Sequence, residues 1–388
     1  MEGLRHDSLF ARYVAERLVG ETFQLADVGC LGGLDPAWRA FGDRLQAIGF
    51  DINEAEVARL NEAETSSRVI YSAQAIGLPN GHPLGRRLAG RPTLHRWPSW
   101  RLSYQRTQLL KEARAMARPA QNLKEHYAEH VWSQTQDGTP PDGWDTDYRA
   151  VISGCGDAPP SGADGPVLIT EALNEMGLTD LDFLKIDVDG GDFEILRSGV
   201  DFLKSSGLLG VGIEVNFVGS HDANDNTFHN VDRFMRAHGF DLFNLTTRQY
   251  SSAALPWPNR YETPGVTAGG RPVQGDALYL RDLSSPLHRL AAAAVSDEKL
   301  LKLAAIFALA NLPDEAAEML LAHEARLRPI VDIDQSLDLL ALQIQENDGT
   351  SRSYADYIAA FEADAPEFLD QDGRRSTWLS NLIAASRG

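Results

Sequence analysis

Short apolar runs alternate with amphipathic stretches at the start of this 388-residue chain. Residues 8–19 repeat apolar side chains at helical spacing and predict a first helix. The apolar stretches TFQLADVGC, AIGFDIN and SRVIYSAQAIG predict three strands. Between them, DPAWRAFGDRLQ and EAEVARLNEAE predict helices, the first with Asp35 at its N-cap and Pro36 in its first turn. This alternation indicates a parallel, doubly wound α/β sheet.

The alternation lapses over residues 79–165, which are rich in Gly and Pro and predict loops with one helix, RTQLLKEARAMAR. It then resumes. The stretches LDFLKIDVD and LLGVGIEVNF predict strands, and VLITEALNEMGL, GDFEILRSGVDFL and TFHNVDRFMRAHGF predict helices. Two late stretches, DLFNLTTRQY and GDALYLRD, would close the sheet as antiparallel strands.

After about residue 285 the chain becomes rich in Ala, Leu and Glu at helical spacing. We therefore expect two domains: residues 1–284 with the sheet, and a smaller all-helical domain over residues 285–388. The helical domain is expected to serve oligomerisation, including a homo-oligomer, or the docking of a partner.

The net charge of −19 argues against a broad nucleic-acid surface or an anionic membrane as partner. Two cysteines, Cys30 and Cys155, lie far apart and form neither a disulfide framework nor a zinc motif. The N-terminus lacks the apolar core of a signal peptide, and no apolar run is long enough to span a membrane. These features predict a cytoplasmic protein.

A glycine turn follows the first predicted strand, in LADVGCLGG. Its glycines would let a ligand approach the backbone, but they lack the spacing of the dinucleotide fingerprint. Asp27, just before Gly29, would repel a pyrophosphate and suit an amine-bearing ligand. S-adenosylmethionine has an ammonium, a sulfonium and no phosphate. A tight turn with an incidental Asp is the alternative.

An acid, Asp51, ends the second predicted strand about 20 residues after the glycine turn. A carboxylate at this position can accept hydrogen bonds from ribose hydroxyls. The alternative is a solvated carboxylate at a strand end. Together, the glycine turn and Asp51 predict a nucleoside site.

The stretch LDFLKIDVDGGDFEIL carries four acids after an apolar run. It does not match the calcium-binding loop of an EF-hand, because it departs from that pattern at three positions. Asp192 and Glu194 fall in the first turn of the next helix, where the helix dipole favours acids. Asp187 stands at the carboxyl end of a strand, where ligands of open α/β sheets bind.

These residues carry a resemblance. DFLKIDVDGGDFEILRSG resembles the hallmark motif of the FkbM-family methyltransferases, and ADVGCLGG and GFDIN resemble the family's glycine turn and the acid after it. The chain departs from the family at Cys30 and Leu31, where Ala and Asn are usual. The resemblance covers about residues 20–282. It implies a Rossmann-like class I methyltransferase fold, S-adenosylmethionine as methyl donor, and O-methylation of a sugar, glycan or secondary metabolite. The cofactor-binding residues expected from it are Asp27, Gly29, Cys30, Gly33, Asp51 and Asn53.

The acceptor hydroxyl needs a base, and three residues are expected to face it: Asp187, Glu214 and His221. His221 would titrate near neutrality. Asp187 and Glu214 could also hold a divalent cation such as magnesium. His95, Trp97 and Trp100 could line an acceptor groove or simply pack within a loop.

Two other functions compete with a methyltransferase. A nicotinamide-dependent oxidoreductase would need a phosphate-binding glycine turn, which the sequence lacks. A non-catalytic scaffold, with a degenerate methyltransferase domain and an interacting helical tail, stays an alternative because of the departures at Cys30 and Leu31.

Overall fold

A computed structural model describes most of the chain, in the ranges 4–79, 166–188, 191–204, 207–217, 223–224, 226–250, 271–345 and 352–363. The chain divides into two compact units. The first comprises Met1–Glu2, Thr22–Asp35 and Leu45–Asp282, and the second comprises Gly3–Glu21, Pro36–Arg44 and Leu283–Gly388. The helical unit therefore takes two early segments in addition to the C-terminal residues that the sequence assigned to it.

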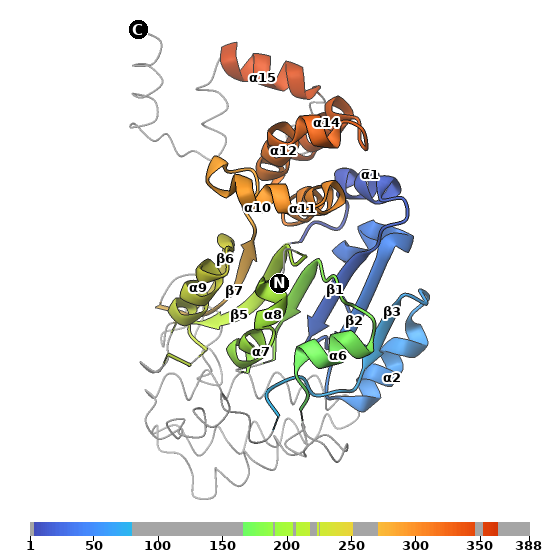
Figure 1. Ribbon diagram of the computed structural model, residues 1–388, viewed down its shortest axis with the longest axis vertical. Helices are drawn as coiled ribbons and strands as arrows, with labels where there is room; N and C mark the ends of the chain where they lie inside the picture. The colour runs from blue at the N-terminus through green and yellow to red at the C-terminus, as the bar shows by residue number, and fades with distance from the viewer. Residues whose placement is uncertain are drawn as a thin grey trace, which may run out of the picture. The chain divides into compact units, whose positions relative to one another are not determined.

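The first unit is built on a seven-stranded sheet in the order β3-β2-β1-β4-β5-β7-β6 (Figure 1). The strands are β1 (Phe23–Val28), β2 (Leu45–Phe50), β3 (Val69–Ser72), β4 (Phe183–Ile186), β5 (Gly210–Asn216), β6 (Asp241–Tyr250) and β7 (Arg271–Leu280). The first five run parallel, and β7 is antiparallel to both of its neighbours. This confirms the predicted Rossmann-like α/β class and the late antiparallel strands.

The order of the strands reverses between β1 and β4, because the chain first builds outward through β2 and β3 and then returns to the other side of β1. Such a reversal separates the loops that leave the two central strands and opens a crevice at their carboxyl ends. Val28 and Ile186 are partners at this end of β1 and β4. The switch point therefore lies next to the glycine turn and Asp187.

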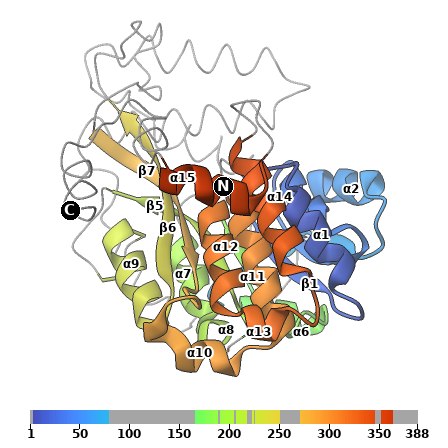
Figure 2. The same cartoon turned by 90° about the horizontal axis from the view of Figure 1, so that it is seen from above.

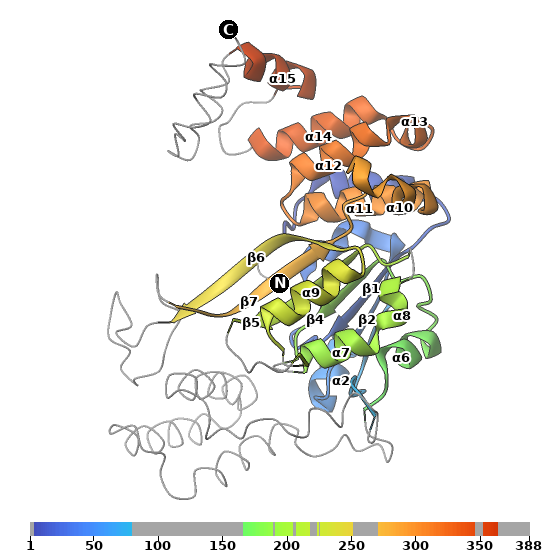
Figure 3. The ribbon, with the colours of Figure 1, turned by 60° about the vertical axis from the view of Figure 1, so that its left-hand side comes forward.

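One face of the sheet packs on helices of the same unit, α6 (Ile169–Glu175), α7 (Asp192–Ser198), α8 (Val200–Lys204) and α9 (Phe228–Ala237) (Figure 3). Alternate strand residues enter this core: Ala26, Val28, Leu184, Ile186, Ile213, Val215, Ala277 and Tyr279. Because strand side chains alternate between faces, the residues between them point to the opposite face. That second set includes the charged residues Asp27, Lys185, Glu214 and Asp276.

The early helices are explained by local sequence. Helix α2 (Glu54–Ala63) begins at Asn53, whose side chain accepts a hydrogen bond from the Glu56 N–H as an N-cap. The predicted α-helix after Asp35 is instead the 3-10 element η1 (Pro36–Arg44), which is interrupted at Gly42, where φ is 50°. The glycine breaks the helical path, and the chain turns directly into β2 at Leu45.

The second unit is all-helical within its described residues. It contains α1 (Leu9–Arg17), η1, η4 (Pro286–His288), α10 (Arg289–Ala294), α11 (Asp297–Leu309), α12 (Pro313–Ala322), α13 (Glu324–Leu327), α14 (Ile333–Gln345) and α15 (Tyr354–Ala363). Helix α11 packs between α1 and α12, and α14 packs on α12 and α15 (Figure 2). Eleven consecutive residues of α11 are buried, which makes it the centre of this unit.

Candidate functional site

The glycine turn after β1 adopts a conformation that only glycine accommodates easily. Gly29, Gly32 and Gly33 all have positive φ, at 86°, 87° and 94°. At Gly29 a Cβ atom would lie 1.9 Å from the carbonyl oxygen of Asp187. The backbone of the turn therefore lies directly against the end of β4, with no room for a side chain.

Backbone hydrogen bonds hold this turn against the end of β2. The carbonyl of Phe50 accepts from the N–H groups of Gly29 and Cys30, at 2.8 and 3.1 Å. Gly49 leaves space for the Cys30 side chain, since a Cβ there would lie 2.7 Å from the Cys30 Sγ atom. Cys30 is 1% exposed, and burial raises the pKa of its thiol. These contacts give Cys30 a packing role; a cofactor contact from its side chain stays a prediction.

Lys185 connects the turn to both central acids. Its Nζ atom lies 2.9 Å from Asp27 Oδ1, 3.1 Å from the carbonyl oxygen of Gly29 and 3.7 Å from Asp187 Oδ2. Asp27 and Lys185 are direct neighbours across β1 and β4, which brings their side chains to the same face. Lys185 lies within the sequence motif, but the local sequence around Lys185 did not indicate an ion-pair partner for it.

The buried lysine remains a cation. Burial alone would lower the pKa of Lys185, but the carboxylates of Asp27 and Asp187 outweigh it and raise the pKa above its ordinary value. Asp27 is 3% exposed, and one of its oxygens is occupied by Lys185. A ligand amine that contacts Asp27 directly, as the sequence predicted, would therefore have to compete with the ammonium group of Lys185 for this carboxylate.

Asp51 lies at the end of β2, one residue beyond Phe50, and is half-buried. Its Oδ1 atom accepts a hydrogen bond from the Asn53 N–H at 2.8 Å, which shapes the turn into α2. Among the residues that the structure describes, Asp51 has no ion-pair partner. Burial raises the pKa of its carboxyl group. Asn53, the other residue predicted here, caps α2 through its side chain.

Asp187 follows β4 directly, and a third of its side chain is exposed. Ile186 pairs with Ile213, so the next residues along the two parallel strands, Asp187 and Glu214, lie side by side at the same edge. The β4–α7 turn behind Asp187 is held by the buried Asp192, whose carboxylate accepts from the Val188 N–H and from Asn226. Asp192 therefore has a structural role, as the sequence predicted.

Glu214 is buried and belongs to a second ion cluster. Arg248, on β6, donates to Glu214 Oε1 and to Asp276 Oδ2, both at 2.9 Å. Asp276 is the direct partner of Glu214 across β5 and β7. Sequence analysis missed Arg248 and Asp276, because only the pairing of three strands distant in sequence brings them to Glu214.

The arrangement weakens the case for a metal between Asp187 and Glu214. A guanidinium already occupies a carboxylate oxygen of Glu214. Within the described residues, neither acid belongs to a group of three or more possible metal ligands. His221, His95, Trp97 and Trp100 lie outside the described residues.

Residues 169–242 match the family model of the methyltransferase FkbM domain. This match supports an FkbM-family methyltransferase domain in the sheet unit. The matched segment runs from α6 through β4 and β5 to the start of β6, so it contains Lys185, Asp187 and Glu214. No curated protein matches the chain. Across the parts of the chain that can be described, no helix has the length and apolarity to cross a membrane.

Replacing Gly29 with Ala should destabilise the protein more than replacing Gly32. Both glycines have positive φ, but only at Gly29 would the new Cβ atom collide with a backbone oxygen. We expect the Gly32→Ala change to cost about 1–2 kcal/mol of unfolding free energy and Gly29→Ala about 3 kcal/mol or more. Chemical denaturation of both variants measures the difference, and equal losses would contradict the close approach to Asp187.

Removing the Lys185 cation should leave Asp27 as an uncompensated buried charge. We expect Lys185→Met to lower the free energy of unfolding by about 3–5 kcal/mol. The double variant Lys185→Met/Asp27→Leu should recover most of this loss, because neither charge is then left unpaired. Urea denaturation of the two variants distinguishes these cases; a double variant no more stable than the single one would show that the ion pair is not the source of the loss.

Proposed function

We propose that this methyltransferase uses S-adenosylmethionine to methylate a hydroxyl group of a sugar, glycan or related secondary metabolite. The observation that carries the proposal is the meeting of the glycine turn, Asp51 and Asp187 at the switch point of the sheet. This is where open α/β sheets bind nucleoside ligands. The family match supports methyl transfer as the reaction class.

The residues around the glycine turn fit the proposed cofactor. Gly29, Gly32 and Gly33 have no side chains, and the space that a Cβ atom would take at Gly32 is open, so that a ligand can approach the backbone of the turn there. Asp51 stands at the neighbouring strand end with a carboxylate suited to ribose hydroxyls. In this proposal Gly29, Gly33 and Asp51 contact the cofactor, Asn53 and Cys30 shape the turn and its neighbours, and Asp27 acts through Lys185.

S-adenosylmethionine would supply the methyl group as an electrophile. The protein must then bring the acceptor oxygen into line and remove its proton. Asp187 suits this task, because its carboxylate is partly exposed and is oriented from one side by Lys185. His221 is the second candidate base. Glu214 holds Arg248 in place rather than acting on the acceptor directly.

The Asp51→Asn variant should weaken the binding of S-adenosylhomocysteine by about tenfold, the effect of one lost hydrogen bond to a charged acceptor. Asn retains an oxygen for the Asn53 N–H, so the turn should persist. Isothermal titration calorimetry gives the affinity, and Glu62→Gln, which removes an exposed acid from α2, is the matched control. Equal affinity in wild type and Asp51→Asn would remove Asp51 from the cofactor site.

The same titration tests the competing functions. Binding of S-adenosylhomocysteine without binding of NADH supports the methyltransferase, and the reverse result would favour an oxidoreductase. Binding of neither ligand by the wild-type protein would favour the scaffold.

Chelation with EDTA should leave the affinity for S-adenosylhomocysteine within about twofold of its value in magnesium, because Arg248 already neutralises Glu214. Calorimetry in the two buffers makes the comparison. A tenfold or larger gain in magnesium would restore the metal site between Asp187 and Glu214.

A further inference from the structure

Helix α2 begins with the sequence of a capping box but does not use it as one. Asn53 is the N-cap, and Glu56 follows three residues later, where a glutamate side chain ordinarily accepts a hydrogen bond from the N–H of the N-cap residue. Here that N–H donates to Asp51 Oδ1 at 2.8 Å instead. Asp51 therefore takes the place of Glu56 in the box, and the Glu56 carboxylate can make another contact.

That contact is with the glycine turn. Glu56 Oε1 accepts a hydrogen bond from the Gly32 N–H at 3.2 Å, between residues that are 24 positions apart in the sequence. Only 17% of the Glu56 side chain is exposed, so most of it lies against the protein. The turn is thus bound by α2 in addition to the bonds that Gly29 and Cys30 make to the end of β2.

Arg59 fixes the direction of the Glu56 carboxylate. Its guanidinium donates to both carboxylate oxygens, at 2.7 and 2.6 Å, from the next turn of the same helix. This pairing lowers the pKa of the Glu56 carboxyl group, so the group is ionised at neutral pH. An ionised acceptor makes a stronger hydrogen bond to the Gly32 N–H than a neutral one would.

Three hydrogen bonds in series connect the two elements of the proposed cofactor site. The Asn53 N–H donates to Asp51, the Glu56 N–H donates to the Asn53 side chain at 3.1 Å, and the Gly32 N–H donates to the Glu56 side chain. Burial raises the pKa of Asp51 most, and the charge of Glu56 adds to this effect, as expected for two neighbouring carboxylates. The first turn of α2 therefore links Asp51 to the glycine turn.

The surroundings of Gly32 show why the turn needs this link. Its φ is 87°, and the preceding residue, Leu31, is 51% exposed. Within the described part of the chain, a Cβ atom at Gly32 would meet nothing within 4 Å. Packing does not hold this side of the turn, so the hydrogen bond to Glu56 fixes it.

We propose that Glu56 is a positioning residue for the cofactor, because it sets the position of the glycine turn relative to Asp51. The inference rests on the proposed function, in which Gly29, Gly33 and Asp51 contact S-adenosylmethionine. A ligand that contacts two elements binds best when they are already correctly placed, because binding then costs no rearrangement. Glu56 acts through Gly32 and not on the ligand itself.

The test is isothermal titration calorimetry of Glu56 variants with S-adenosylhomocysteine. Glu56→Ala removes the acceptor, and Glu56→Asp keeps the charge but shortens the side chain by one methylene, so that it no longer spans the distance to Gly32. We expect each to bind about tenfold more weakly than the wild type. Glu56→Gln retains an oxygen for the Gly32 N–H and should stay within about threefold of the wild type.

A double-mutant cycle with Asp51→Asn tests the link between the two elements. Asp51→Asn alone is expected to weaken binding about tenfold, and independent effects would multiply to about a hundredfold loss in Glu56→Ala/Asp51→Asn. We expect the double variant to lose at most about thirtyfold, because a misplaced turn costs little once the Asp51 carboxylate is gone. A general loss of stability would not produce this coupling.

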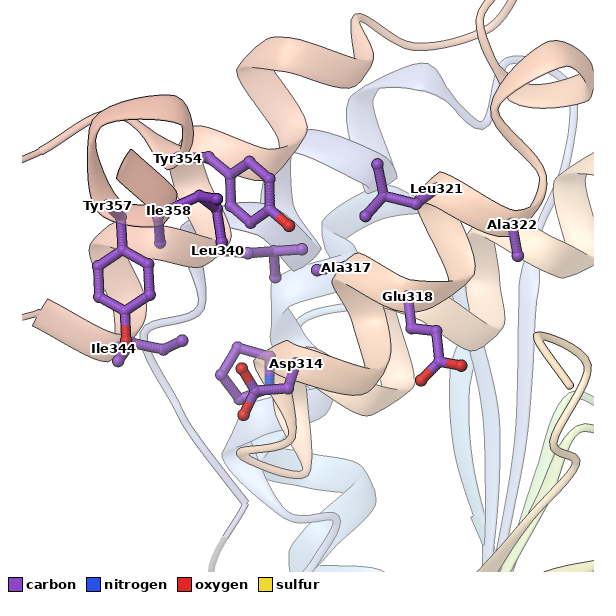
Figure 4. Close-up of a pocket in the computed structure, with 12 residues that line it drawn as sticks. Asp314, Ala317, Glu318, Leu321, Ala322, Leu340, Ile344, Tyr354, Tyr357 and Ile358 are labelled. Carbon is purple, nitrogen blue, oxygen red and sulfur yellow. The ribbon is translucent and has the colours of Figure 1, made fainter. Parts of the chain in front are cut away.

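Two control variants remove an acid elsewhere. Glu62→Gln changes an exposed residue of α2 itself. Glu318→Gln changes an exposed residue of α12 in the helical unit, where Glu318 lines an apolar hollow between α12, α14 and α15 (Figure 4). Both should bind S-adenosylhomocysteine like the wild type. Circular dichroism and thermal denaturation of every variant measure whether the fold is retained.

Three results would overturn the proposal. Affinities of Glu56→Ala and Glu56→Asp within about twofold of the wild type, with Asp51→Asn about tenfold weaker, would leave the proposed function intact and remove Glu56 from it. Losses that multiply in the double variant would mean that Glu56 supports α2 independently of the site. A wild-type protein that does not bind S-adenosylhomocysteine would contradict the proposed function itself, and this inference with it.

Discussion

The centre of the sheet unit depends on the ion pairs and the hydrogen bond that the ammonium group of Lys185 makes. This group joins the strand that ends in the glycine turn to the strand that ends in Asp187, and it also binds the carbonyl of Gly29. Burial raises the pKa of the Asp27 carboxyl group, and the paired ammonium of Lys185 opposes this by stabilising the charged carboxylate. The close contact of Gly29 with the Asp187 carbonyl follows from the register that pairs Val28 with Ile186, and Lys185 adds side-chain hydrogen bonds between the same two strand ends.

The second ion cluster joins β5, β7 and β6, the strands on the other side of β4. Arg248 lies between Glu214 and Asp276 and satisfies both acids with one guanidinium fork. The two clusters flank Asp187, which is the more exposed acid between them. Asp27, Glu214 and Asp276 are buried in ion pairs between neighbouring strands, whereas Asp187, which also lies 3.7 Å from Lys185, keeps a third of its side chain exposed.

Two glycines of the sheet unit allow its segments to pack closely at the same edge. Gly29 permits the contact with β4, and Gly49 makes room for Cys30 beneath the turn. Both positions bring one backbone close to another chain segment, which no larger residue would allow. The departure of Cys30 from the residue usual in the family is therefore accommodated by packing against Gly49 and need not disturb the backbone of the turn.

Sequence alone determined the order and type of most elements, because hydrophobic periodicity and glycine, proline and Asn signals act over a few residues. The strands around Asp27, Asp51 and Asp187 and the helices after residue 285 follow from such local patterns. It also identified the three acids that the switch point brings together.

Tertiary structure decided what each of these acids contacts. Asp27 meets Lys185, and Glu214 meets Arg248 and Asp276, only through the pairing of strands that are distant in sequence. The sequence patterns also did not predict that residues 3–21 and 36–44 belong to the same unit as the C-terminal helices. Local patterns report whether a residue is buried and in which element, but the partner of a buried charge is set by the register of neighbouring strands, which no short stretch of sequence encodes.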